Sequence, residues 1–416
     1  YTPTHTLSLH DALPISPNVS PSDLRVMLNE LAGQEGQLTL MSILRALPQE
    51  SLNINLGTLA LLASQFRLAQ MESEALSRVL ENELEVTTPA VGRILASAPF
   101  TEGNSQVERW ELVLRDRARE RSIPIDIYWS QDTHGPMVVI SHGFGADRRF
   151  FAYLAQHLAS HGLTVVSVEH PGSNVASLMS LPSQQAKDDL PPNRILPATE
   201  FLDRPRDISF VLDRMERLNY YSYSLRGRLS TDQVTLIGHS LGGYTAFALA
   251  GAQLDLRPLA RFCQQLSPVK FSPADWLQCA ALDLPVNRAD LKDERVSQVV
   301  VMNPLTGLLF GDQGLNQVKL PTLMFASTHD GVTPVAEQQL HPFNELPGQK
   351  YLVTMIGGSH LSVGDPENLN SELARIPFMP ELPNEKTRRL RSFVQGVSLS
   401  FIMQQTPRAD DYRNIL

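Results

Sequence analysis

The sequence predicts an α/β fold: a mostly parallel central sheet with helices on both faces, a cap insertion and a small helical N-terminal domain. Two patterns lead to this prediction. Short apolar runs alternate with amphipathic segments over most of the chain, and a serine flanked by glycines directly follows one of these runs. Strand–helix alternation is typical of a parallel sheet covered on both sides. With 416 residues, the chain has room for one large α/β domain and a smaller one.

Composition excludes several classes of protein. Hydrophobic residues make up 42% of the chain and charged residues 19%, which is typical of a globular protein. The net charge of −9 argues against nucleic acid as a partner, because phosphate backbones select lysine and arginine. No apolar run in the sequence reaches the roughly 18 residues that span a bilayer. We find no metal-binding or nucleotide-binding motif and predict no metal and no cofactor.

The first residues are predicted not to belong to the protein. Thr6–Ile15 reads as the in-frame translation of a common sequencing adapter, and the chain begins with Tyr1 instead of methionine. We therefore leave residues 1–15 out of the fold prediction as an artefact. On this interpretation any signal peptide, with some of the N-terminal domain, would be missing, so the sequence leaves the compartment open.

Residues 16–95 are predicted to form a helical N-terminal domain. Ser20 followed by Pro21 is typical of a helix start. Apolar residues then recur at the spacing of one helix face, at Leu24, Met27, Leu28 and Leu31. The region contains no paired carboxylates and no glycine loop, so we interpret its apolar faces as packing surfaces.

Residues 104–408 are predicted to form the catalytic domain. Eight short runs are predicted as strands, the first two as an antiparallel pair: 110–115, 123–129, 136–140, 163–168, 234–237, 299–302, 322–326 and 351–355. Amphipathic segments predict helices at 150–161, 206–218 and 244–249 and a last helix that includes Leu390–Phe401. The long segment 172–197 is predicted as a loop over the strand ends.

The strongest functional signal is G-H-S-L-G-G, which follows the predicted strand 234–237 and opens a helix. This is the G-x-S-x-G pattern in the strand–turn–helix context that it requires. The turn leaves room only for glycine at Gly238 and Gly242, and it exposes the hydroxyl of Ser240 above the sheet. We therefore predict Ser240 as a nucleophile.

A serine hydroxyl needs a base, and in this kind of fold the partners follow in the order serine, acid, histidine. His360 lies on a glycine-containing loop after the last predicted strand and is our choice of base, with His170 as its rival. Asp330 follows an apolar strand and is our choice of acid, which would orient the imidazole. The rival acid position, one strand earlier, holds Asn303 and no carboxylate.

The stretch S-H-G-F-G follows a buried strand, and its glycines are Gly143 and Gly145. A glycine-rich loop in this position offers backbone N–H groups to an oxyanion. We predict the amides of Phe144 and Leu241 as the two donors. His142 is interpreted as structural.

The segment 253–296 interrupts the sheet and is predicted to form a cap that selects the acyl group. Cys263 and Cys279 both lie in it. A disulfide between them would suit an oxidising compartment, periplasmic or secreted. Two free buried cysteines are the alternative.

The motifs S-H-G-F-G-A, V-E-H-P-G-S and G-H-S-L-G-G resemble the platelet-activating-factor acetylhydrolase and dienelactone hydrolase branches of the α/β-hydrolases, and the helix start Arg204–Asp207 is similar too. After the adapter, the chain resembles cyanobacterial α/β-hydrolases with a helical N-terminal domain of unknown function. The resemblance implies the α/β-hydrolase fold. The chain departs from eukaryotic acetylhydrolases in placing its acid after a later strand, and from dienelactone hydrolases in having serine in place of cysteine.

These residues predict a serine hydrolase that cleaves carboxylic esters through an acyl-enzyme. Ser240 attacks, His360 transfers the proton and Asp330 orients the histidine. The substrate would be a small-molecule or lipid ester, and the oligomeric state stays open. One alternative is a lipase or phospholipid deacylase. Another, from a different class, is a catalytically silent binding protein with a hydrolase fold.

Overall fold

The structure is a computed structural model that describes residues 97–178, 180, 196–265, 272–368, 384–412 and 415, together with residues 75, 78 and 79. The predicted artefact at 1–15 and nearly all of the predicted helical domain at 16–95 lie outside these residues. Most of the loop predicted at 172–197 lies outside them too.

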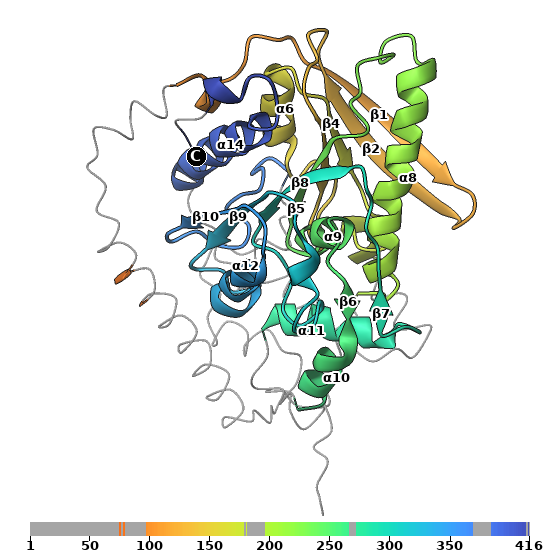
Figure 1. The fold of residues 1–416 in the computed structure, drawn as a ribbon, viewed down its shortest axis with the longest axis vertical. Coiled ribbons are helices and arrows are strands. Elements are labelled where there is room, and N and C mark those ends of the chain that lie inside the picture. Colours follow the sequence, from red (N-terminus) through yellow and green to blue (C-terminus); the bar gives the residue numbers. More distant parts are fainter. Residues whose placement is uncertain are drawn as a thin grey trace, which may run out of the picture. The chain divides into compact units, whose positions relative to one another are not determined.

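Within the described part of the chain, one eight-stranded sheet has the order β1-β2-β4-β3-β5-β8-β9-β10 (Figure 1). Its strands are β1 (Glu108–Asp116), β2 (Arg121–Trp129), β3 (Met137–Ser141), β4 (Val165–Val168), β5 (Val234–His239), β8 (Val296–Met302), β9 (Thr322–Ser327) and β10 (Lys350–Met355). β1 pairs antiparallel with β2, and β2 with β4, whereas the strands from β4 to β10 in this order are parallel. The prediction of a mostly parallel sheet is confirmed.

The helices that follow the strands are α6 (Ala152–Ser160), α8 (Glu200–Tyr221), α9 (Leu241–Leu249), α12 (His341–Glu345) and α14 (Asn384–Met403). Shorter helical turns are η1 (Ala98–Phe100), η3 (Leu315–Gln317), η5 (Ala409–Asp411) and the π-helix η4 (Val335–Leu340). The segment between α9 and β8 contains β6 (Leu254–Asp255), α10 (Leu256–Gln265), α11 (Pro273–Cys279), η2 (Ala280–Asp283) and β7 (Arg288–Ala289).

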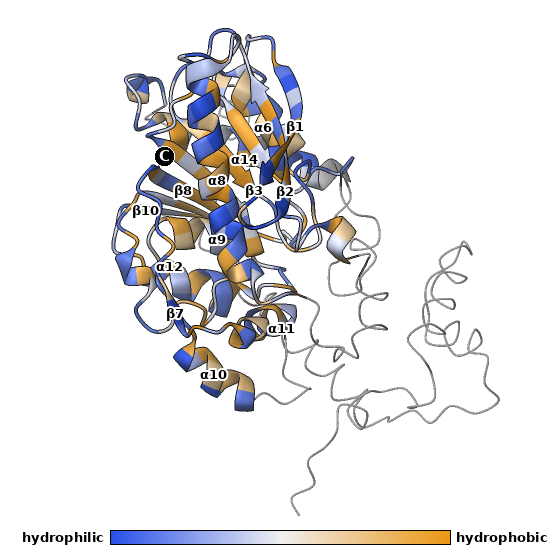
Figure 2. Ribbon diagram, turned by 90° about the vertical axis from the view of Figure 1, so that its right-hand side faces the viewer, coloured by the Kyte–Doolittle hydropathy of each residue, from blue (hydrophilic) through white to orange (hydrophobic). Residues whose placement is uncertain are grey.

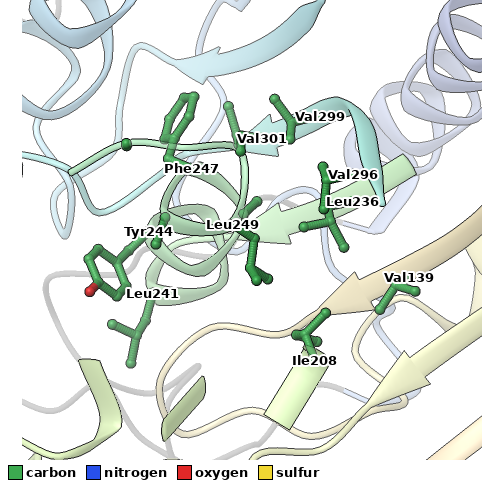
Figure 3. Packing of buried hydrophobic residues seen from close by; sticks show 14 of the residues in the cluster. Val139, Ile208, Leu236, Leu241, Tyr244, Phe247, Leu249, Val296, Val299 and Val301 are labelled. Atoms are coloured by element: carbon green, nitrogen blue, oxygen red, sulfur yellow. The ribbon is translucent and has the colours of Figure 1, made fainter. Parts of the chain in front are cut away.

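Alternate side chains of the strands enter two separate hydrophobic clusters. Val139 and Leu236 belong to the first, with Ile208 of α8 and Tyr244 of α9 (Figure 3). Val138, the neighbour of Val139, belongs to the second, which α6 and α14 complete. Successive strand residues point to opposite faces, so the two clusters are the two sides of one sheet. Figure 2 shows hydrophobic colour on strands inside this sheet, and mixed hydrophilic and hydrophobic colour on helices such as α10.

The beginning of α8 corrects a prediction. The sequence predicts a helix over 206–218 with its start at the R-P-R-D segment, but α8 begins at Glu200 and contains Pro205. Proline lacks an N–H, so it leaves the carbonyl four residues earlier without its helical partner. That carbonyl belongs to Phe201, and the hydroxyl of Tyr244 donates to it at 2.7 Å. A distant residue therefore satisfies the group that local sequence leaves open.

The predicted cap segment 253–296 is closed at its base by the antiparallel pair β6–β7. Cys263 in α10 and Cys279 in α11 form a disulfide, with 6.0 Å between their Cα atoms. The backbone N–H of Ala274 in α11 donates to the carbonyl oxygen of Val332 at 3.0 Å. The cap thus contacts the loop that follows β9.

The parallel strands bring their carboxyl ends together. The register pairs Ser141 of β3 with Gly238 of β5, and His239 of β5 with Met302 of β8. Ligands of open α/β sheets bind outside the carboxyl ends of the strands. The S-H-G-F-G loop begins at Ser141, and Ser240 directly follows His239. Both predicted functional segments therefore lie at this edge of the sheet.

Candidate active site

A single residue connects β5 to α9, and that residue is Ser240. Its backbone has φ 53° and ψ −119°, which residues other than glycine rarely adopt. Its carbonyl oxygen accepts hydrogen bonds from the backbone N–H groups of Gly243 at 2.8 Å and Leu305 at 2.9 Å. The strained turn is therefore bonded both to α9 and to the segment after β8. Ser240 is only 3% exposed.

The glycines around this turn are required by close packing. A Cβ on Gly242 would lie 2.0 Å from the carbonyl oxygen of Ser141, and one on Gly238 would lie 2.1 Å from the carbonyl oxygen of Gly242. A Cβ on Gly143 would lie 3.1 Å from the Cβ of Ser240. The loop after β3 and the serine turn are thus in direct contact.

The predicted acid and base form a buried pair. His360 Nδ1 lies 2.7 Å from Asp330 Oδ2. The other carboxylate oxygen accepts from the backbone N–H groups of Val332 at 2.9 Å and Thr333 at 2.8 Å, and the Thr333 hydroxyl donates to Oδ2 at 2.7 Å. A fixed carboxylate favours the tautomer in which Nδ1 carries the hydrogen. The imidazole Nε2 then has the lone pair that a base needs.

His239 connects the serine turn to the predicted base, His360. Its Nε2 donates to the backbone carbonyl oxygen of His360 at 2.9 Å, and the two rings are 4.6 Å apart between centroids. The ring of Phe150 stacks on it at 4.9 Å. Burial, and then the neighbouring His360, hold the pKa of His239 well below its usual range. The neutral ring of His239 therefore supports the loop of His360, and the next residue in the chain is Ser240.

Two further residues bond to the Asp330–His360 pair or its loop, and the sequence did not predict a role for either of them. Asn303 follows β8 with φ 45°, accepts from the Ser327 N–H at 3.0 Å and donates to the carbonyl oxygen of His360 at 3.1 Å. Gln339 lies in η4 and donates to Asp330 Oδ2 at 3.2 Å. Asn303 stands at a strand end, which is a signal the sequence offered. Gln339 has no such signal, because its place depends on the rare π-helical winding.

The two predicted oxyanion donors belong to segments that meet at Ser240. Leu241 is the first residue of α9, and Phe144 follows Gly143 in the adjoining loop. Gly145, with φ 72°, donates its N–H to the carbonyl oxygen of Ser173 at 2.9 Å. Within the described residues, the amide hydrogens of Phe144 and Leu241 are not bonded to another group of the protein.

The rival base His170 is placed elsewhere. Its Nδ1 lies 3.1 Å from Asp207 Oδ2, and its Nε2 lies 3.0 Å from the hydroxyl of Ser141. Burial, followed by the charges of Arg204 and Arg121, holds its pKa well below the usual range. Both of its ring nitrogens are thus engaged with residues other than Ser240.

Comparison with known proteins identifies the family of the chain. Residues 138–372, more than half of the chain, match the model of the "Alpha/beta hydrolase family". The chain belongs to the alpha/beta hydrolase family. The α/β-hydrolase fold predicted from its motifs is thereby confirmed.

The hydrolase is also similar to three mammalian proteins named "Platelet-activating factor acetylhydrolase". It is 28% identical over 136 residues to that of Cavia porcellus, 26% over 139 residues to that of Bos taurus and 27% over 139 residues to that of Canis lupus familiaris. Each match covers 26% of the hydrolase and 30% of its relative. The similarity therefore concerns less than a third of those proteins.

Among the residues that the structure describes, no group of three or more histidine, cysteine, aspartate or glutamate side chains could hold a metal ion. None of the helices in that part of the hydrolase is both long and apolar enough to cross a membrane.

Proposed function

We propose that this hydrolase cleaves carboxylic esters with Ser240, His360 and Asp330 as its catalytic residues. The observation that carries the proposal is the buried pair of His360 and Asp330, 2.7 Å apart, tied through His239 to the turn that holds Ser240. A serine, a carboxylate and an imidazole in this order along the chain are the parts of an acyl-transfer site.

The proposed reaction has two halves. His360 Nε2 removes the proton from Ser240 Oγ as that oxygen attacks the ester carbonyl carbon. The tetrahedral intermediate collapses, the C–O bond to the alcohol breaks, and His360 gives its proton to the leaving oxygen. Water then attacks the acyl-enzyme by the same route and releases the acid. Asp330 stabilises the imidazolium that forms in each half.

The amides of Phe144 and Leu241 are proposed to stabilise the negative oxygen of each tetrahedral intermediate. Both lie in segments that touch Ser240, and Leu241 is at the N-terminus of α9, where the helix dipole also favours negative charge. Losing one donor of this kind typically lowers kcat by about 10²–10³.

A second candidate within the same chemistry is a phospholipid deacylase. The names of the mammalian relatives favour it, since they are acetylhydrolases of a platelet-activating factor. The cap adds an observation, because α11 contacts the loop of the catalytic acid through Val332 and presents a half-exposed Trp276. A cap beside the acid is suited to selecting the acyl group or the alcohol of the substrate.

The test is hydrolysis of p-nitrophenyl acetate, butyrate and octanoate, and of a short-acyl phosphatidylcholine, by the chain and by Ser240→Ala. We expect turnover by the chain and none by the variant. The profile over the four substrates distinguishes a short-chain esterase from a phospholipid deacylase. Equal rates for a folded chain and the variant on every ester would contradict the proposal and favour the binding-protein alternative.

The proposed setting is an oxidising compartment, periplasmic or extracellular. The disulfide between Cys263 and Cys279 supports it, because such bonds persist outside the reducing cytoplasm. Measuring the free thiols of the protein taken directly from its native cells tests this. Two free thiols would contradict it.

A further inference from the structure

The peptide groups that carry the two proposed oxyanion amides are held in different ways. In a trans peptide the C=O and the following N–H point in opposite directions, so a bond to the carbonyl fixes the aim of the amide. The carbonyl of Ser240, which precedes the Leu241 amide, is bonded by backbone N–H groups. The carbonyl of Gly143, which precedes the Phe144 amide, accepts from the side chain of His142, with 2.6 Å between Nδ1 and O. The only backbone donor to it in the described residues is the Ala146 N–H, at a longer 3.3 Å.

The ring of His142 is itself fixed in one tautomer. Its Nε2 accepts from the backbone N–H of His170 at 3.0 Å, so the hydrogen of the neutral ring is on Nδ1, facing Gly143. Burial, followed by the charge of Arg204, holds the pKa of His142 well below its usual range. The neutral ring therefore has one donor, and it is directed at the peptide in front of Phe144.

A buried guanidinium fixes the peptide on the other side of His142. Arg204 is fully buried and donates to the backbone carbonyl oxygen of His142. Its Nε donates to the hydroxyl of Thr245 at 3.1 Å, and that hydroxyl donates to the carbonyl oxygen of Leu241 at 3.0 Å. One side chain therefore contacts both segments that carry the proposed oxyanion donors.

Arg204 is kept in place by a closed ring of hydrogen bonds and ion pairs. From Arg204 one arm passes through Ser141 and His170 to Asp207, and the other passes through Ser173 to Glu200. Arg121 of β2 closes the ring, because its Nη2 lies 2.9 Å from Glu200 and 2.8 Å from Asp207. The buried charges are thereby paired through hydroxyl groups, which such charges require.

We propose that His142 is a positioning residue that aims the Phe144 amide at the oxyanion, and that Arg204 supports it by fixing the preceding peptide. The inference rests on the proposed function, since it assigns a role within that reaction. His142 does not touch the substrate on this account. It acts through the Gly143–Phe144 peptide.

The test uses three substitutions of His142 that remove different hydrogen-bonding nitrogens of its imidazole. In His142→Asn the side-chain nitrogen takes the place of Nδ1 and keeps the donor to Gly143. In His142→Gln the side-chain amide reaches the place of Nε2 and keeps only the contact with the His170 N–H. His142→Ala removes both. As a matched control, His157→Gln replaces a buried histidine of α6 that bonds the carbonyl oxygen of Pro99 at 3.0 Å.

The readout is kcat/KM for p-nitrophenyl acetate and for its thionoester, in which sulfur replaces the carbonyl oxygen. A sulfur anion is a weak hydrogen-bond acceptor, so an aimed amide accelerates the thionoester little. For His142→Ala and His142→Gln we expect kcat on the oxygen ester to fall by about 10–100-fold with KM changed little, and turnover of the thionoester to fall by less than about threefold. His142→Asn and the His157→Gln control should retain the oxygen-to-sulfur preference of the wild type.

Each other result overturns the inference. Equal losses on both esters in all three variants would show a merely structural role, and His142→Asn as impaired as His142→Ala would show that the Nδ1 donor is irrelevant. If wild-type turnover depends on Ser240 and His142→Ala has the wild-type rates, only this inference fails. If wild-type turnover does not depend on Ser240, the proposed function fails and the inference fails with it.

Discussion

The side-chain amide of Asn303 donates a hydrogen bond to the backbone carbonyl oxygen of His360, with 3.1 Å between Nδ2 and O. Its own oxygen accepts from the backbone N–H of Ser327 at 3.0 Å, so the orientation of the amide is determined. Asn303 occupies the strand end where a rival acid could stand. At this position the amide holds the loop of the proposed base by its backbone. The carboxylate that contacts the imidazole, Asp330, follows the next strand in the sheet.

This relationship predicts that the acid cannot be moved one strand back. Asp330→Asn should lower kcat on p-nitrophenyl acetate by about 10³–10⁴, because an amide favours the wrong tautomer of His360. The double variant Asp330→Asn/Asn303→Asp should not recover activity, since position 303 faces the backbone of the base and not its ring. Initial rates for the two variants, with circular dichroism to check the fold, test this. Recovery of more than about tenfold in the double variant would place the acid after β8.

Two neighbouring glutamines of η4 should differ in their effect on catalysis. Gln339 donates to Asp330 Oδ2 at 3.2 Å, whereas Gln338 accepts from the backbone N–H of Thr306 at 2.9 Å and makes no hydrogen bond to Asp330 within the described residues. Both substitutions to alanine should cost about 1–3 kcal/mol of stability, because each leaves a buried polar group unsatisfied. Only Gln339→Ala should also lower kcat, by about tenfold.

Urea unfolding together with kcat for the two variants checks this prediction. The pair controls for loss of a buried amide in the same helix. Similar kcat values for Gln338→Ala and Gln339→Ala would mean that Gln339 does not help to position the acid.

The strands were predictable because their signal is local. Each of the eight is a run of apolar residues or an alternation that reflects burial on one or both faces, and the glycines around Ser240 reveal a tight turn directly. The start of α8 was not predictable, because the carbonyl freed by Pro205 is satisfied by Tyr244, forty-three residues from its acceptor Phe201. Contacts between distant parts of a chain leave no periodic pattern in the sequence.

The candidate site also contains residues that were predictable from the sequence and residues that were not. Ser240 and His360 follow strands inside glycine-rich segments, so their types and places are visible in the sequence. The supports of the site are buried polar residues whose partners lie on other elements, such as Gln339 with Asp330 and Arg204 with His142. Arg204 is charged and would be assigned to the surface by composition. Only its buried ring of partners reveals its place.

Gly242→Ala should prevent the native packing of the serine turn. The added Cβ would lie 2.0 Å from the backbone carbonyl oxygen of Ser141, which neither segment can relieve without separating. We expect a loss of more than about 3 kcal/mol in the free energy of unfolding. Gly227→Ala is the control, since φ is +70° there but nothing lies within 4 Å of its Cβ position, so its cost should be about 1–2 kcal/mol.

Urea unfolding monitored by tryptophan fluorescence compares the two glycine variants. A Gly242→Ala protein as stable as Gly227→Ala would show that the loop after β3 and the serine turn are not in the contact described.

The disulfide of the cap should affect substrate binding as well as stability. It connects α10 to α11, and α11 contacts the loop of Asp330 through the bond between Ala274 and Val332. Its two cysteines are separated by 16 residues, and closing a loop of this size contributes about 3 kcal/mol by the chain-entropy model. Cys263→Ser/Cys279→Ser should therefore lower the Tm and raise KM, with a smaller effect on kcat.

Thermal unfolding and ester kinetics with and without a reducing agent test the role of the disulfide. The wild type should respond to reduction, and the double variant should not. If reduction changes kcat strongly and leaves KM unchanged, the cap does not act through substrate binding.

Stability should fall in weak acid because several histidines are buried in the neutral form. Burial is the main cause that lowers the pKa of His157 to about 4, with the nearby His161 adding to it. Below pH 6.5 the unfolded chain takes up a proton at this residue and the folded chain does not, so the free energy of unfolding decreases as the pH falls, until the folded pKa is reached. For this residue the loss is about 2 kcal/mol at pH 5. His157→Gln keeps a donor for Pro99 and cannot titrate, so it should lose about that much less than the wild type between pH 8 and pH 5. Urea unfolding at both pH values measures the difference, and equal losses in the two proteins would mean that His157 is not held neutral by the fold.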